Sequence, residues 1–133
     1  MLKVNRRLKN LCVRANAIGD KGEEDIGQAL KVNNTLKRLS LGIKNIGDKG
    51  VKGIGEALMV NEKLVSLDLK RNVIGGEGAK ILCESLKVNK RLTRLDLGRN
   101  RLDNEAKQAL NIAADYDVNI TYWIPYLLEE QRR

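Results

Sequence analysis

Leucine and other apolar residues recur along the chain at one fixed interval, the step from Leu8 to Leu36. Three positions follow this interval with polar residues between them: Leu8, Leu36, Leu64 and Leu92; Leu11, Leu39, Leu67 and Leu95; and Val13, Leu41, Leu69 and Leu97. A second apolar set keeps the same step further along each unit: Ile26, Ile54, Leu82 and Leu110. No insertion breaks the register, so the sequence predicts an array of identical structural units.

Each unit has two halves with different periodicities. In the first half, Leu67 and Leu69 alternate with polar neighbours, which indicates a short, half-buried strand. In the second half, Ile54, Ala57 and Leu58 fall on one face of a helix that begins near Gly50. Stacking such units predicts a right-handed α/β solenoid with a parallel sheet inside and helices outside. It should curve, because helices are wider than strands.

The repeat resembles the leucine-rich repeat family, in particular its ribonuclease-inhibitor-like class of 28-residue repeats. The pattern L-x-x-L-x-L-x-x-N stands at residues 64–72, and I-G-D-x-G stands at residues 18–22 and 46–50. That class includes the Ran GTPase-activating protein, the C-terminal domain of tropomodulin and the receptor part of NOD-like sensors. The resemblance implies a ladder in which Asn16, Asn72 and Asn100 bond neighbouring backbone. Lys44 departs from the pattern, which predicts a local defect that Asn45 relieves.

The ends of the chain depart from the regular array. We expect one domain over residues 1–133, with the end of a preceding repeat at 1–5 and repeats at 6–33, 34–61, 62–89 and 90–117. Both a fragment of a longer array and a short natural protein fit this start. We expect a strand and cap at 118–133, where Ile120, Trp123 and Pro125 take the places of Leu92, Leu95 and Leu97. Trp123 would then close the core; ligand stacking is the alternative.

Composition weighs against an enzyme. The chain has no His and only 3% aromatic residues, and His is the commonest general base and metal ligand. Asp68 and Asp96 should lie one strand apart, but no other feature supports a catalytic pair. We therefore predict no catalytic, metal or cofactor site. Cys12 and Cys83 fall on opposite faces and should stay free thiols, which is typical of a reducing compartment such as the cytoplasm. No apolar run suits a membrane span, and we expect no membrane partner.

Charge is strongly positive but has a structural explanation. The formal net charge is +8 and the pI is about 9.7, which raises nucleic acid as a partner. Acids gather at the predicted helix starts and bases after the helix ends, as the helix dipole favours. No aromatic residues are interleaved with the bases for stacking. We therefore expect no nucleic-acid partner.

The inner face of the predicted sheet is the candidate binding surface, because its side chains are not needed for the core. Arg and Tyr often dominate binding energy, and this face should carry both. The candidate protein-binding residues are Arg38, Asp68, Lys70, Arg71, Arg94, Asp96, Arg99, Tyr122 and Tyr126. They predict a non-catalytic interaction module that docks its concave sheet face on an acidic or mixed-charge protein and modulates it.

Several versions of this function stay open from the sequence alone. One is an inhibitor, or a regulator or effector of an intracellular bacterium that is delivered into a host cell. Another is a ligand-sensing or scaffold fragment of a larger NOD-like receptor. A GTPase regulator is a more distant alternative, because no motif selects the required residue. The oligomeric state is open, and pairing through the edge of the first repeat is one option.

Overall fold

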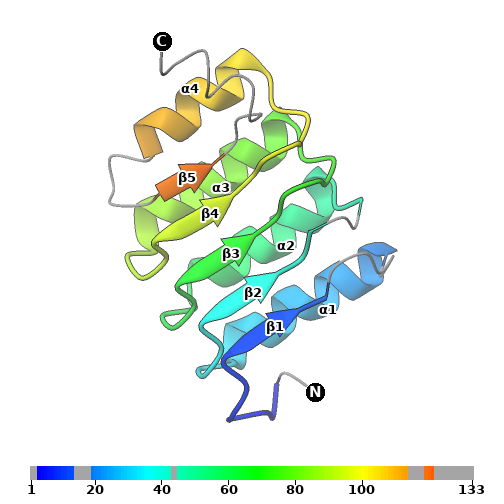
Figure 1. The fold of residues 1–133 in the computed structure, drawn as a ribbon, viewed down its shortest axis with the longest axis vertical. Coiled ribbons are helices and arrows are strands. Elements are labelled where there is room, and N and C mark those ends of the chain that lie inside the picture. The colour runs from blue at the N-terminus through cyan, green and yellow to red at the C-terminus, as the bar shows by residue number, and fades with distance from the viewer. Residues whose placement is uncertain (1–2, 14–18, 43–44, 114–118, 122–133) are drawn as a thin grey trace.

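A computed structural model of the chain describes residues 3–13, 19–42, 45–113 and 119–121. Short strands alternate with helices, and the strands form one parallel sheet in chain order with the helices side by side on one of its faces (Figure 1). The elements are β1 (Asn10–Cys12), α1 (Gly19–Val32), β2 (Arg38–Ser40), α2 (Asp48–Leu58), β3 (Ser66–Asp68), α3 (Gly76–Val88), β4 (Arg94–Asp96), α4 (Asn104–Ala113) and β5 (Asn119–Thr121). The predicted α/β solenoid is therefore confirmed.

The first four strands pair with the offset that the sequence predicts. Leu11 lies beside Leu39, Leu39 beside Leu67, and Leu67 beside Leu95. The residues on either side of these leucines keep the same register, so equivalent residues of successive repeats lie directly beside one another in the sheet.

The last strand departs from the predicted register. Ile120 lies beside Leu95, and Asn119 and Thr121 lie beside Arg94 and Asp96. Ile120 is predicted at the position of Leu92, but it stands at the position predicted for Trp123, so that prediction is wrong. The step from Leu95 to Ile120 is 25 residues, whereas the step from Leu67 to Leu95 is 28, so the unit that ends in β5 is three residues shorter than the one before it. Trp123 and Pro125 lie outside the described residues.

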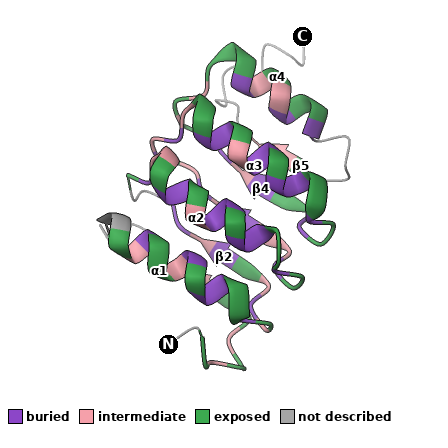
Figure 2. Ribbon diagram, turned by 180° about the vertical axis from the view of Figure 1, so that it is seen from behind, coloured by how far each residue is buried: buried purple, intermediate pink, exposed green. Residues whose placement is uncertain are grey.

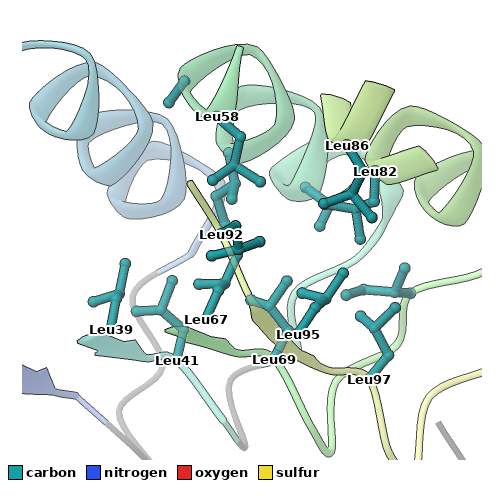
Figure 3. Packing of buried hydrophobic residues seen from close by; sticks show 14 of the residues in the cluster. Leu39, Leu41, Leu58, Leu67, Leu69, Leu82, Leu86, Leu92, Leu95 and Leu97 are labelled. Carbon is teal, nitrogen blue, oxygen red and sulfur yellow. The ribbon is translucent and has the colours of Figure 1, made fainter. Parts of the chain in front are cut away.

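The core is a layer of aliphatic side chains between the sheet and the helices. Leu67, Leu69 and Leu95 point from the strands toward the buried faces of α2 and α3 (Figure 3), and they are at most 1% exposed. Leu58 and Leu82 meet them from the helices. Each helix shows one buried stripe and one exposed stripe (Figure 2), as the helical half of the repeat predicts.

Small residues let neighbouring helices approach closely. A Cβ atom at Gly27 of α1 would lie 2.9 Å from the carbonyl oxygen of Gly53 in α2. One and two repeats on from Gly27 stand Gly55 and Cys83, both buried. A Cβ atom at Gly55 would lie 2.6 Å from Cγ2 of Ile81. Cys83 is buried, and this burial raises the pKa of its thiol, which disfavours the thiolate form.

The motif asparagines form the expected ladder where they are described. Nδ2 of Asn72 donates to the carbonyl oxygens of Leu41 at 3.1 Å and Leu69 at 2.8 Å, and its Oδ1 accepts from the backbone N–H of Ile46 at 2.9 Å. Asn100 repeats these bonds one unit further on. The implied ladder is confirmed at these two positions, while Asn16 and Lys44 lie outside the described residues. Asn45 is exposed, unlike the buried Asn72.

A second asparagine ladder runs through the connections between helices and strands. Asn61 donates from Nδ2 to the carbonyl oxygens of Leu30 at 2.7 Å and Asn33 at 3.2 Å. Its Oδ1 accepts from the backbone N–H groups of Lys63 at 2.9 Å and Leu64 at 2.8 Å. Asn89 makes the equivalent bonds one repeat on. The sequence shows these residues recurring, but the pattern alone assigns them no structural role.

Candidate functional site

The strands present their polar residues on the face of the sheet that the helices leave open. Arg94 and Asp96 flank the buried Leu95 on β4, and successive side chains of a strand point to opposite faces. The same alternation holds for Ser66 and Asp68 on β3. We call this exposed side of the sheet the open face. It can be followed in Figure 1, where the strands lie in front of the helices.

Four of the predicted site residues meet in one shallow hollow on the open face. The hollow has a volume of about 260 Å³ and spans β3, β4 and β5, and Asp68, Lys70, Arg94 and Asp96 line it. Asn119 and Thr121 complete its wall. The sequence reasoning misses these last two residues, because placing Trp123 at the position of Leu95 puts its neighbours Tyr122 and Ile124 beside Arg94 and Asp96. That assignment is wrong for the register reason given above.

The two aspartates also have a structural task. Oδ1 of Asp68 accepts the backbone N–H of Lys70 at 3.0 Å, and Oδ1 of Asp96 accepts the backbone N–H of Gly98 at 2.9 Å. Such bonds to the backbone two residues on stabilise a turn. Oδ2 of Asp68 additionally accepts the Ser40 hydroxyl at 3.3 Å. These carboxylates therefore stabilise the turns that follow β3 and β4. Substituting either aspartate would destabilise a turn as well as change the charge of the surface.

The remaining candidates differ in what the structure shows of them. Arg38 is exposed at the start of β2, in register with Ser66. Arg71 and Arg99 are exposed in the turns that follow β3 and β4. Tyr122 and Tyr126 lie outside the described residues. The structure thus describes the arginines, the lysine and the aspartates of the predicted surface, but not its two tyrosines.

Arg71 and Arg99 adopt left-handed backbone conformations, with φ angles of 57° and 55°. A residue with a Cβ atom is destabilised by roughly 1–2 kcal/mol in that region, whereas glycine is not. Each arginine directly precedes a ladder asparagine, and the backbone N–H of Arg71 donates to the carbonyl oxygen of Gly98 at 2.8 Å. The turn fixes the conformation, but it does not require an arginine side chain.

We therefore expect Arg71→Gly to raise the free energy of unfolding by about 1 kcal/mol, because it removes the left-handed strain. The same change should weaken binding of a partner on the open face, because it removes the exposed guanidinium of one of the candidate binding residues. Thermal denaturation and binding measured on the same sample check both effects. Arg71→Lys is the control, since it keeps the charge and the strain. A variant that is neither more stable nor weaker in binding would contradict the expectation.

The described residues offer no group suited to metal chemistry. Within the part of the chain that the structure covers, no cluster of three or more His, Cys, Asp or Glu side chains could hold a metal ion. Over the same residues, no helix has the length and apolar character needed to span a membrane. Cys12 is exposed on β1 and Cys83 is buried in α3, and both are free thiols.

The comparison with protein families agrees with the geometry of strands, helices and ladders. The family described as Leucine Rich repeat matches residues 32–55, 60–83 and 88–110, which is more than half of the chain. The chain belongs to the leucine-rich repeat family. The finer assignment to the ribonuclease-inhibitor-like class stays an expectation from the repeat length and the I-G-D-x-G motif. A search of curated proteins finds no match.

Solved structures with the same fold include two leucine-rich repeat domains. The tropomodulin C-terminal domain of Caenorhabditis elegans superposes with a TM-score of 0.82 at 15% identity, covering 92% of this chain and 78% of the other. Leiomodin-1 actin-binding site 2 gives a TM-score of 0.77 at 20% identity, covering 87% of this chain and 70% of the other. At these identities the similarity establishes the fold. Family and fold together indicate a protein–protein interaction module.

Proposed function

We propose that this leucine-rich repeat chain is a non-catalytic module that binds one partner protein through the open face of its sheet and modulates it by covering its working surface. The observation that carries this proposal is the hollow across β3, β4 and β5, where Lys70 and Arg94 stand beside Asp68 and Asp96. These side chains extend from a sheet that fixes their spacing. A rigid platform reduces the ordering cost of binding.

The charge of the open face suggests the chemistry of the partner. Its candidate residues include five cations, Arg38, Lys70, Arg71, Arg94 and Arg99, and two carboxylates. One oxygen of each carboxylate already accepts a backbone N–H. The hydrogen-bonding capacity that the face offers to a partner is therefore mainly that of donors. This supports an acidic or mixed-charge partner surface.

The finer identity of the partner and of the cellular role is also a proposal. The leiomodin-1 domain is described as an actin-binding site, so actin is one partner to test directly. The exposed thiol of Cys12 and the free thiol of Cys83 favour a reducing compartment. An inhibitor or a bacterial effector would bind through the open face of the chain as it stands. A receptor fragment would need further repeats, and a GTPase regulator would accelerate nucleotide hydrolysis.

A pair of double variants tests the open face. After capture of a partner from the native cell, Lys70→Ala with Arg94→Ala should weaken binding by about 2 kcal/mol, the usual threshold of an interface hot spot. That corresponds to roughly 30-fold in Kd. Both side chains line the hollow, and neither belongs to the core, so the melting temperature should change little.

Lys52→Ala with Lys80→Ala is the matched control, because it removes two exposed lysines from α2 and α3 on the far side of the sheet. Isothermal titration calorimetry should find its Kd close to that of the unaltered chain. If the helix pair weakens binding more than the sheet pair, the partner binds to the helices and the proposal is wrong.

A further inference from the structure

Four exposed valines recur at one place in every repeat. Val4, Val32, Val60 and Val88 are 77%, 60%, 57% and 57% exposed, and each follows its predecessor by one full repeat. The last three stand where a helix ends and the chain turns toward the next strand, and Val4 stands at the same place ahead of β1. Figure 1 shows these connections together on one side of the molecule. We call these four residues the valine row. Exposed apolar residues that recur along one side of a protein form a candidate docking surface.

The positive charge of the chain lies around this row. The four segments 3–9, 31–37, 59–65 and 87–93 each contain one valine of the row, and together they hold ten Lys and Arg residues and one acid, Glu62. The rest of the chain holds 15 bases and 16 acids. The net charge of +8 therefore comes entirely from these segments, which we call the basic rim. The helix dipole accounts for bases near helix ends, but it does not account for the valines.

Cations crowd together within the rim. The pKa of the Lys37 ammonium is lowered, first by partial burial and then by the charges of its neighbours Arg91, Lys63 and Lys9. These four side chains come from different repeats, so the fold assembles a positive field that the sequence spreads from Lys9 to Arg91. A negatively charged partner would relieve their mutual repulsion.

A hollow between two repeats joins the apolar and basic parts of the rim. It has a volume of about 420 Å³, and its lining includes Leu58, Met59 and Val88 together with two cations, Lys90 and Arg91, and one acid, Glu62. Met59 and Val88 are 40% and 57% exposed. The hollow therefore suits an apolar side chain that has a carboxylate beside it.

We propose that the basic rim with its valine row is a second docking surface, separate from the open face, and that it binds an acidic amphipathic helix of a partner protein. Neighbouring helices of a stack lie about 8–10 Å apart, so the valines should recur at about that spacing. Two turns of an α-helix, or about seven residues, rise about 10.5 Å. A helix lying along the row would place one apolar side chain at each valine, with Asp or Glu beside it facing the cations.

Nucleic acid fits this surface less well. The four rim segments contain no aromatic residue on which a base could stack. Contacts to phosphate would use the lysines and arginines but would leave the valine row in water. An anionic membrane could also be attracted by the lysines and arginines. Sedimentation with lipid vesicles, described below, distinguishes it from a helix.

The probe is a fluorescein-labelled synthetic helix of three heptads, about 21 residues, with Leu at every seventh position, Glu on both sides of each Leu and Ala elsewhere. Fluorescence anisotropy should show saturable binding to the full chain that weakens with salt. Replacing Val32, Val60 and Val88 by Ser should weaken binding at least about tenfold. Ile112→Ser, which removes a 65% exposed apolar side chain of α4 that is not part of the row, should leave it unchanged.

Charge variants complete the test. Lys63→Glu with Arg91→Glu should weaken binding of the helix by more than about tenfold, whereas Lys52→Glu with Lys80→Glu should change it far less. Circular dichroism should show unchanged melting for the serine variants, since the replaced side chains are exposed. A helix of the same composition with its leucines scattered around the axis should bind poorly.

Three results would overturn the proposal. The first is no binding of the probe helix, or binding that the serine variants leave unaltered. The second is equal binding of the scattered helix, which would mean attraction by net charge alone. The third is sedimentation with phosphatidylserine vesicles that depends on the valines while the helix does not bind, which would assign the rim to membranes. Because Lys70 and Arg94 are untouched, none of these results bears on the open face.

Discussion

Asn61→Ala is expected to lower the free energy of unfolding by about 3–4 kcal/mol. The Asn61 side chain is 5% exposed and makes four hydrogen bonds to backbone, two as donor and two as acceptor. Alanine leaves the carbonyl oxygens of Leu30 and Asn33 without this donor and two N–H groups without their acceptor. Each buried polar group left unpaired costs about 1–3 kcal/mol, and water recovers part of it.

Chemical denaturation followed by circular dichroism measures this loss. Asn34→Ala is the matched control, because Asn34 is exposed in the equivalent connection of the preceding repeat, and it should change stability by less than about 0.5 kcal/mol. Asn61→Asp should also destabilise the chain at neutral pH, since it retains the acceptor but turns a charge toward two carbonyl oxygens. Equal stability of Asn61→Ala and Asn34→Ala would show that the second ladder does not stabilise the stack.

Gly27→Ala is expected to lower the free energy of unfolding by about 2–3 kcal/mol. The added Cβ atom would lie 2.9 Å from the carbonyl oxygen and 3.0 Å from the carbonyl carbon of Gly53. Both are backbone atoms, so the contact is relieved only if α1 and α2 move apart, and overpacking of this kind typically costs about 1–3 kcal/mol.

Gly53→Ala, at the same contact between α1 and α2, is expected to raise the free energy of unfolding. A Cβ atom there has 4.0 Å to its nearest neighbour, the Cα atom of Glu24. Alanine is the better helix former by about 0.8–1.0 kcal/mol, so this variant should be more stable than the parent chain. Paired thermal melts measure the difference. Destabilisation by both changes, or by neither, would mean that the helices are not packed as described.

Sequence periodicity predicts the repeats well because each buried position is specified again in every unit. The repeat places Leu39, Leu67 and Leu95 on neighbouring strands, and they pair as expected. The last strand departs from the prediction for a physical reason. Ile120 is an apolar residue that suits the position of Leu92 as well as that of Leu95, so hydrophobicity alone does not reveal that the last unit is three residues shorter than the others.

The residues that line the candidate site are predictable from the sequence, but the hydrogen bonds that some of them make to the backbone are not. Lys70, Arg94, Asp68 and Asp96 do line one hollow. The alternation of buried leucines indicates which residues face away from the core, but not whether a carboxylate bonds to backbone. From the sequence, Asp68 and Asp96 therefore look like pure surface residues, although each holds a turn. Similarly, the recurrence of Asn61 and Asn89 is visible, yet the bonds that explain it cross from one repeat to the next.

The valine row is a second feature that is hard to predict from short stretches of the sequence. Residues one repeat apart are distant in sequence, and no local window of the chain contains two of them. Only stacking brings them to one edge. A surface built in this way is found by comparing the same position across repeats, since each repeat contributes one residue to it.

Lysine labelling of the complex followed by mass spectrometry tests most directly whether the partner covers the open face of the sheet. We expect the captured partner to slow modification of Lys70 several-fold, while Lys52 and Lys80 on the helices react at the rate of the free chain. Slowed labelling of Lys52 and Lys80 with Lys70 unchanged would contradict this expectation and place the partner on the helical side.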